Sequence, residues 1–212
     1  MASVLQRRCG LRRVGFAGLG WLGGVARPFA GRARTVRYIP LREDRAWDFA
    51  PQNPAAPFLA AYDGASAGDV VVIATGGARE AGILGEMLAL RLRALGVAGV
   101  VCDGGMRDVE AVAASGPPVL CAGAAPASST ASLMLVDVGL PVDLAGVTVF
   151  PGDWIVADAD GALLCPAAEW EGALADVAAR EAAEVGVRAR VAAGEPLLGL
   201  YPPPVPATGG SG

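Results

Sequence analysis

At Val97-Ala98-Gly99-Val100-Val101-Cys102-Asp103-Gly104-Gly105-Met106-Arg107-Asp108, an apolar run passes directly into a polar turn. The apolar half is typical of a buried strand, and open α/β sheets bind ligands at the carboxyl ends of their strands. Arg107 can hold a carboxylate through two parallel hydrogen bonds, and Asp108 can bind a hard metal ion. The turn therefore indicates a ligand site; the alternative is a tight turn closed by a surface Arg–Asp pair.

A second buried strand is expected at residues 69–75, followed by a helix that begins near Gly82 and is closed by Gly96 in the C′ position. This strand–helix–strand unit predicts two parallel strands joined by a right-handed crossover. The turns after both strands then open at one edge of the sheet. We expect Gly85 and Arg107 to face one small anionic ligand there.

The glycines at positions 76, 77, 82 and 85 do not have GxGxxG spacing, so a dinucleotide fingerprint is excluded. Backbone N–H groups at the start of the following helix predict an anion site instead, and close helix–sheet packing is the alternative explanation of the glycines.

Elsewhere we expect a half-exposed strand at 33–39, a proline-rich loop at 47–57, a helix at 107–115 and a strand at 118–121. A hairpin is expected at 154–157 and 162–165. The last expected element is a long amphipathic helix at 169–191, with four apolar side chains facing inward: Trp170, Leu174, Val177 and Val185. This pattern favours a layered α/β sandwich over a dinucleotide-binding fold.

The chain has 212 residues and contains no His and no Lys. Within one subunit this excludes Ser-His-Asp and Cys-His catalysis, a Schiff-base lysine, a P-loop lysine and a His-ligated zinc site. If the chain is an enzyme, its acid–base groups must be carboxylates, Tyr, Cys or water, and we expect them to work with a metal that accepts oxygen ligands. A compositional bias toward Arg explains the missing Lys equally well.

The net charge of −4 gives no nucleic-acid footprint, and no stretch is a convincing membrane span. The four cysteines form no CxxC pair. Three of them lie within or beside apolar runs and are expected to be small core residues in a reducing, cytoplasmic compartment. The first acid is Glu43, after nine arginines. That basic start fits a signal peptide, a mitochondrial transit peptide or an ordinary ragged N-terminus, and we favour the last.

We expect a poorly ordered N-terminal segment at residues 1–19, one domain at 20–200 and a flexible tail at 201–212.

Several pieces of the sequence recur together in one known family. They read Gly-Arg-Ala-Arg-Thr-Val at 31–36, Gly-Asp-Val-Val-Val at 68–72, Gly-Glu-Met-Leu at 85–88, Gly-Val-Ala-Gly-Val-Val-Cys-Asp-Gly-Gly-Met-Arg-Asp at 96–108, Pro-Val at 118–119, Gly-Val-Thr-Val-Phe-Pro-Gly-Asp at 146–153 and Ala-Asp-Ala-Asp-Gly at 157–161. With them the chain resembles RraA-like proteins, which include class II 4-hydroxy-4-methyl-2-oxoglutarate/4-carboxy-4-hydroxy-2-oxoadipate aldolases. The resemblance runs from about residue 20 to 200.

The resemblance implies an α/β/α sandwich of the swivelling, phosphohistidine-domain-like type, assembled as a homotrimer or hexamer with a site between subunits. It implies a lyase that uses Mg²⁺ or Mn²⁺ to release pyruvate from a small 2-oxo acid, by aldol cleavage or oxaloacetate decarboxylation. Residues implied to bind substrate are Gly85, Glu86, Met87, Leu88 and Arg107.

In the same comparison, the metal aspartate falls on Asp108, and Arg107 would stabilise the oxyanion. Asp103 and Glu86 are the candidate proton carriers, because the chain has no His. Aldolase members often carry an acid three residues after the metal aspartate, where this chain has Ala111. The alternative function is therefore a non-catalytic regulator that binds and inhibits an RNase E-like ribonuclease.

Overall fold

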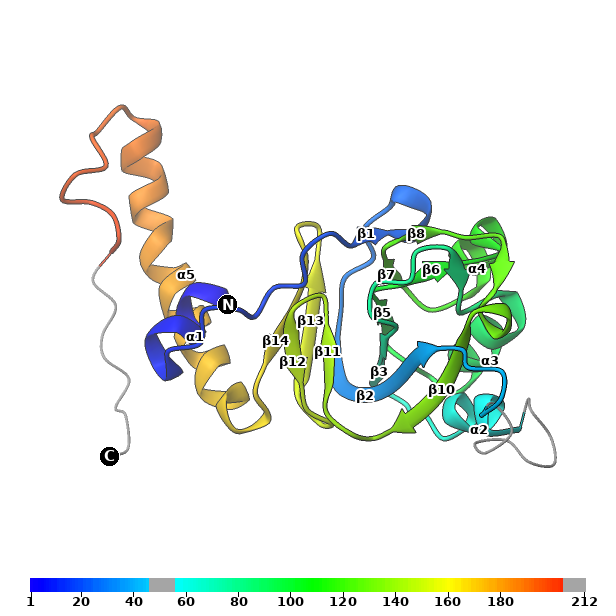
Figure 1. Ribbon diagram of the computed structural model, residues 1–212. Helices are drawn as coiled ribbons and strands as arrows, with labels where there is room; N and C mark the ends of the chain where they lie inside the picture. Colours follow the sequence, from blue (N-terminus) through cyan, green and yellow to red (C-terminus); the bar gives the residue numbers. More distant parts are fainter. Residues whose placement is uncertain (46–55, 204–212) are drawn as a thin grey trace. The chain divides into compact units, whose positions relative to one another are not determined.

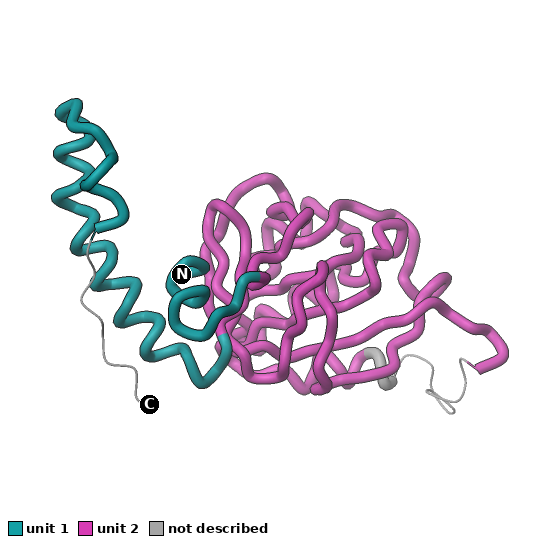
Figure 2. Tube along the Cα trace, turned by 60° about the vertical axis from the view of Figure 1, so that its left-hand side comes forward, with its two compact units in different colours: residues 1–12, 166–212 teal, residues 13–165 magenta. Residues whose placement is uncertain are grey.

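The computed structural model describes residues 1–45 and 56–203, as two compact units (Figure 2). One unit is Arg13–Cys165; the other combines Met1–Arg12 with the chain from Pro166 onward. These boundaries differ from the predicted division at 1–19, 20–200 and 201–212. Most of the predicted loop at 47–57 lies outside the described residues, and so does all of the tail after residue 203.

The unit Arg13–Cys165 is built on a mixed sheet with strand order β1-β7-β5-β3-β2-β13-β14, in which β10 also pairs with β2 (Figure 1). Its strands are β1 (Gly20–Trp21), β2 (Phe29–Pro40), β3 (Asp69–Ala74), β5 (Gly99–Cys102), β7 (Val119–Cys121), β10 (Leu133–Val138), β13 (Trp154–Asp158) and β14 (Gly161–Cys165). The strands β2, β3, β5 and β7 run parallel, and β1, β10, β13 and β14 join antiparallel. The predicted parallel unit and the predicted hairpin are confirmed.

Alternate residues of β3 supply two separate cores. Val71 and Ile73 pack in one cluster with residues of the helices, and Val70 and Val72 pack in the other. The helices of the first face are α2 (Ala56–Asp63), α3 (Glu86–Ala94) and α4 (Val109–Ser115). The second face is covered by the hairpin of β11 (Val142–Leu144) and β12 (Val147–Val149) (Figure 1). The α/β class is confirmed, with a β hairpin where the α/β/α expectation places a second helical layer.

The strand predicted at 33–39 is part of the longer β2, which lies inside the sheet because it pairs with β3 on one side and with β10 and β13 on the other. Helix α3 ends as predicted. Gly96 has φ +77° and donates its N–H to the carbonyl of Arg93, while Val97 N–H bonds to the carbonyl of Leu92. This pair of bonds is a Schellman motif.

A second, small parallel sheet forms from the turns that follow the main strands. It has the order β8-β6-β4-β9, with β4 (Ala81–Gly82), β6 (Gly105–Met106), β8 (Gly123–Ala124) and β9 (Ala127–Ser128). Gly82 pairs with Gly105. The predicted helix start near Gly82 is therefore wrong: α3 begins at Glu86, because residues 81–82 form a strand.

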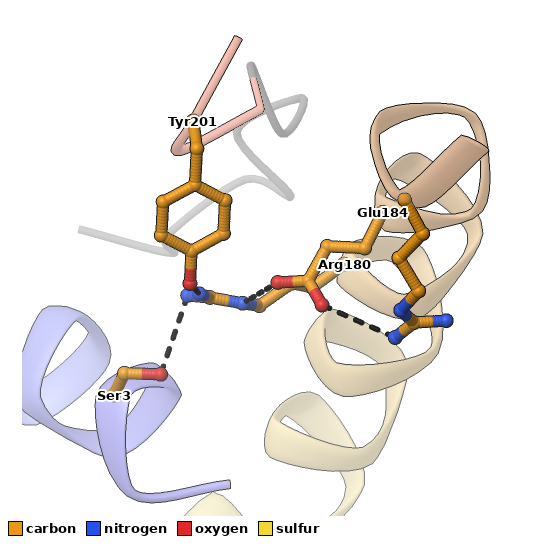
Figure 3. Close-up of polar contacts among 5 residues, drawn as sticks. Ser3, Arg180, Glu184 and Tyr201 are labelled. Carbon is orange, nitrogen blue, oxygen red and sulfur yellow. Dashed lines mark hydrogen bonds and ion pairs between the residues drawn. The ribbon is translucent and has the colours of Figure 1, made fainter. Parts of the chain in front are cut away.

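The other unit pairs α1 (Ala2–Cys9) with α5 (Trp170–Ala192). The Arg8 guanidinium bonds to Glu169 at 3.0 Å and to Asp176 at 2.8 Å. Arg180 on α5 joins three parts of the unit by donating to Glu184, to Ser3 on α1 and to Tyr201 after α5 (Figure 3). A helix thus lies within the segment that we expected to be poorly ordered.

The predicted inward face of α5 is wrong in part. Leu174 and Val185 are 40% and 63% exposed, and the buried residue of this helix is Ala173. Among the described residues of this unit, α1 has eight residues against the 23 of α5, so it is too short to cover an apolar stripe along the whole helix.

Three of the four cysteines are buried, and Cys9 is exposed. Within residues 1–45 and 56–203, no helix combines the length and the apolar character that crossing a bilayer requires.

Candidate active site

A cavity of about 560 Å³ opens where the small sheet meets the start of α3. It lies entirely within the unit Arg13–Cys165. Its walls come from the first turn of α3, the turn after β6 and the 3₁₀ helix η3 (Ser129–Ala131). Its lining residues are Leu59, Gly82, Ile83, Gly85, Glu86, Met87, Leu88, Arg107, Asp108, Ser128, Ser129 and Thr130.

The small sheet brings the two predicted motifs together. Besides the Gly82–Gly105 pair, the N–H of Ile83 donates to the carbonyl of Gly105, and the N–H of Arg107 donates to the carbonyl of Leu84. These bonds tie the segment before α3 to the segment before α4. Gly85 and Arg107, 22 residues apart in the chain, consequently line one cavity.

Asp108 is the N-cap residue of α4 and has left-handed backbone angles, φ 53° and ψ 41°. A non-glycine residue in this region is strained, although Asp tolerates it better than most residues. Its Oδ2 accepts a hydrogen bond of 3.1 Å from the backbone N–H of Glu86 and lies 3.9 Å from Nε of Arg107. The strained backbone thus holds the carboxylate at the entrance of α3.

Gly85 leaves room for both charged side chains. A Cβ atom at this position would stand 2.5 Å from Oδ2 of Asp108 and 2.7 Å from Nε of Arg107. Its φ of −119° is open to any residue, so space and not backbone conformation requires glycine here. Any side chain at position 85 would displace the acid or the guanidinium.

The first turn of α3 presents backbone donors to the cavity. The first N–H groups of a helix have no partner within the helix, and they attract anions. We expected the amides of residues 85–88 to hold a carboxylate, but the N–H of Glu86 is taken by Asp108. Among the described residues, Met87 and Leu88 N–H have no acceptor, and these two remain for a ligand.

The oxygen ligands available to a metal ion are few. Asp108 and Glu86 bring carboxylates to the cavity, and the part of the chain that the structure describes contains no group of three His, Cys, Asp or Glu residues able to hold a metal. Mg²⁺ usually keeps several waters and takes one or two protein carboxylates together with substrate oxygens. The donor set fits such an ion, and it does not fit one enclosed by protein ligands alone.

Asp103 lies outside this cavity. The residue is 7% exposed, and its carboxylate accepts three hydrogen bonds, from Thr75 N–H at 2.6 Å, Thr75 Oγ1 at 2.8 Å and Gly77 N–H at 3.1 Å. It lines a different cavity of about 630 Å³, together with Arg37 and Arg79. Asp103 therefore fixes the glycine turn after β3, and the structure does not bring it together with Arg107 and Asp108.

Sequence reasoning missed the hydroxyl-bearing run Ser128-Ser129-Thr130. It reaches the cavity because β9 pairs with β4, with Ser128 opposite Gly82. Three consecutive hydroxyl residues are visible in the sequence, but their approach to Gly85 depends on a strand pairing between distant segments.

Solved structures with this fold include two RraA proteins. Streptomyces coelicolor RraAS2, described as an unusual member of the RNase ES inhibitor RraA protein family, has 30% identity and a TM-score of 0.77 over 88% of this chain and 90% of its own. RraA from Thermus thermophilis, described as an RNA-processing inhibitor, has 30% identity and a TM-score of 0.57 over 78% and 92%.

Curated relatives carry the name "Putative 4-hydroxy-4-methyl-2-oxoglutarate aldolase". The one from Halalkalibacterium halodurans is 37% identical over 110 residues, which are 52% of this chain, and the chain spans about half of that relative's length, 52%. The one from Thermus thermophilus is 37% identical over 145 residues, which are 68% of this chain and 79% of the relative.

The family model described as Aldolase/RraA matches residues 11–164, nearly three quarters of the chain and all of the segments that form the cavity. The RraA structures reproduce the same mixed α/β fold. With this match, the chain belongs to the RraA-like family.

Proposed function

We propose that this protein is a divalent-metal-dependent lyase that cleaves a small 2-oxo acid and releases pyruvate. The observation that carries the proposal is the placement of Arg107, Asp108 and the unpaired first-turn amides of α3 around one cavity. The curated relatives named as aldolases support the reaction class.

The binding roles follow from charge and donor geometry. The N–H groups of Met87 and Leu88 hold the C1 carboxylate of the 2-oxo acid, aided by the positive end of the α3 dipole. Arg107, whose side chain is 47% exposed, donates to the C2 oxygen and stabilises the negative charge that develops there when the C3–C4 bond breaks.

Asp108 would hold Mg²⁺ or Mn²⁺, and Glu86, which lines the same cavity, would orient a water bound to the ion. A divalent ion bound there would act as a Lewis acid toward the two oxygens of the 2-oxo acid. Glu86 is the group proposed to move the proton, since Asp103 lies outside the cavity and the chain has no His or Lys.

The rim of the cavity is apolar and open. Met87 is 68% exposed and Leu59 is 45% exposed. Such residues are suited to contact a neighbouring subunit, and we propose a homotrimer or hexamer in which that contact narrows the site. Light scattering coupled to size exclusion measures the mass of the assembly, and a monomer at assay concentration would contradict this proposal.

The direct test measures pyruvate release from 4-hydroxy-4-methyl-2-oxoglutarate and from oxaloacetate, with Mg²⁺ or Mn²⁺ and then with EDTA. Metal-dependent pyruvate is the expected result. A folded protein that releases no pyruvate above the metal-only background from either substrate would overturn the lyase proposal.

A regulator of a ribonuclease is the second candidate. The likeness to RraAS2 over 88% of the chain favours it, together with Ala111 in the position where an acid often follows the metal aspartate. In that case the chain would form a stable complex with an RNase E-like enzyme and slow its cleavage of RNA, and an Asp108→Asn variant would act as well as the parent.

A further inference from the structure

Ser129 is a buried hydroxyl residue on the wall of the candidate active site. It is 3% exposed and lines the same cavity as Arg107 and Asp108. Within residues 1–45 and 56–203, no hydrogen-bond partner is found for its side chain. The hydroxyl oxygen is not among the fully enclosed side-chain atoms without a partner, so it keeps access to the cavity, where a water or a ligand can complete its hydrogen bonding.

The neighbouring hydroxyls behave differently. Ser128 Oγ and Thr130 Oγ1 form a hydrogen bond of 2.9 Å with each other, on the exposed side of the segment. Ser129 is the first residue of η3, which follows β9 and contacts β4. Two of the three hydroxyls thus bond to each other, and the Ser129 hydroxyl remains available to a ligand in the cavity.

The position of Ser129 complements the groups already assigned. In the proposed complex, Arg107 binds the C2 oxygen of the 2-oxo acid, and the first turn of α3 binds its carboxylate. Ser129 comes from η3, a different wall of the cavity. A hydroxyl can both donate and accept a hydrogen bond. In the substrate, the polar group beyond C3 is the one to which no protein partner has yet been assigned.

We propose that Ser129 binds the C4 hydroxyl of a 4-hydroxy-2-oxo acid and makes the site selective for aldol cleavage over decarboxylation. This inference rests on the lyase function proposed above. In aldol cleavage the C3–C4 bond breaks, its electron pair stays on C3, and the C4 hydroxyl loses its proton and becomes the carbonyl of the second product. C3 then takes up a proton, so one substrate gives pyruvate and one oxo acid.

Oxaloacetate makes a suitable contrast because its C4 is a carboxylate. When its C3–C4 bond breaks, C4 leaves as carbon dioxide, C3 is protonated to give pyruvate, and no hydroxyl takes part. Ser129 has no C4 hydroxyl to bind in that reaction. The ratio of the two activities therefore reports on this residue and not on the machinery shared by both reactions.

The experiment compares Ser129→Ala with the parent on 4-hydroxy-4-methyl-2-oxoglutarate and on oxaloacetate, as kcat/KM for pyruvate release with Mg²⁺. The aldolase value should fall about tenfold, the worth of one neutral hydrogen bond, while the oxaloacetate value stays unchanged. The thermal midpoint should hold, since the variant removes no hydrogen bond among the described residues. Ser132→Ala, three residues away and outside the cavity lining, is the matched control and should change neither activity.

An equal loss with both substrates, or no loss with either, would overturn the role of Ser129 and leave the lyase intact. Turnover of oxaloacetate alone by the parent would also overturn it. Absence of pyruvate from both substrates in the parent would instead remove the lyase function, and this inference with it.

Discussion

The carboxylate of Asp108 accepts a hydrogen bond of 3.1 Å at Oδ2 from the backbone N–H of Glu86. This bond joins the N-cap of α4 to the first residue of α3. It holds the acid in place through one oxygen, so the other can serve a ligand. The arrangement explains how a single exposed aspartate can be fixed in position without a ring of protein ligands.

Replacing Asp108 by Asn should abolish metal-dependent pyruvate release. Asn tolerates the left-handed backbone and can still accept the Glu86 N–H, so the fold should survive while the charge is lost. We expect kcat/KM to fall about hundredfold or more, with little change in the thermal midpoint. Glu110→Gln, an exposed acid two residues away that does not line the cavity, is the control and should keep its activity.

Replacing Gly85 by Ala should disable the site by steric conflict. The added Cβ meets Asp108 at 2.5 Å and Arg107 at 2.7 Å, so the guanidinium or the acid must move. We expect turnover to fall by at least about tenfold. Gly186→Ala, in the middle of α5 with nothing within 4 Å of the new atom, should instead stabilise the protein by about 0.5–1 kcal/mol. Normal turnover in the Gly85 variant would contradict the geometry.

Introducing an acid at Ala111 should strengthen metal binding. Position 111 is three residues after Asp108 in the first turn of α4, where the helix dipole also favours a negative charge. Titration of Ala111→Asp with Mn²⁺ should show several-fold tighter binding than the parent. The control is Ala114→Asp, an exposed position one turn further along, which should bind Mn²⁺ as the parent does.

Removing the Arg180 side chain should loosen the unit that contains α1. Its guanidinium donates to Ser3 at 3.2 Å, to Glu184 at 2.8 Å and to Tyr201 at 2.5 Å (Figure 3). We expect Arg180→Ala to cost about 1–2 kcal/mol of local stability, seen as faster amide hydrogen exchange in α1 with β3 unchanged. Arg188, 64% exposed and paired with the same Glu184, should have almost no effect when changed to Ala.

Alkaline pH should destabilise the unit Arg13–Cys165. Burial raises the pKa of the Cys102 thiol well above its ordinary value, and burial raises the pKa of Tyr62 in the same direction. The unfolded chain then loses these protons first, so stability is complete below about pH 8.5 and falls as the pH rises above it. Thermal midpoints between pH 7 and 10.5 should show this decline, with a smaller slope in Cys102→Ala. Cys9→Ala, at an exposed thiol, should leave the slope unchanged.

The elements that sequence predicts well depend on local patterns. The apolar run that forms β3, the Asp-Gly turn of the β13–β14 hairpin and the Gly96 C′ residue each determine their structure from neighbouring residues. The motif around Arg107 and Asp108 was visible for the same reason, because its polar residues directly follow a strand.

The features that sequence reasoning missed depend on distant partners. Gly82 belongs to a strand because Gly105 pairs with it across 23 residues, and nothing near Gly82 announces that partner. The same pairing delays the start of α3, and the pairing of β9 with β4 brings Ser129 to the cavity. Leu174 and Val185 were assigned inward from their spacing alone, and spacing does not reveal how much surface the short α1 can cover.

The ion pair between Arg8 and Glu169 joins residues 161 positions apart. It can therefore form only after the ribosome has synthesised the chain between them. During vectorial synthesis α1 emerges early, with Val4 and Leu5 that are almost completely buried in the finished structure. The strands of Arg13–Cys165 can assemble while α5 is still being translated. Throughout that interval α1 lacks its contacts with α5, so the pairing of the two helices forms only after the chain has been synthesised through α5.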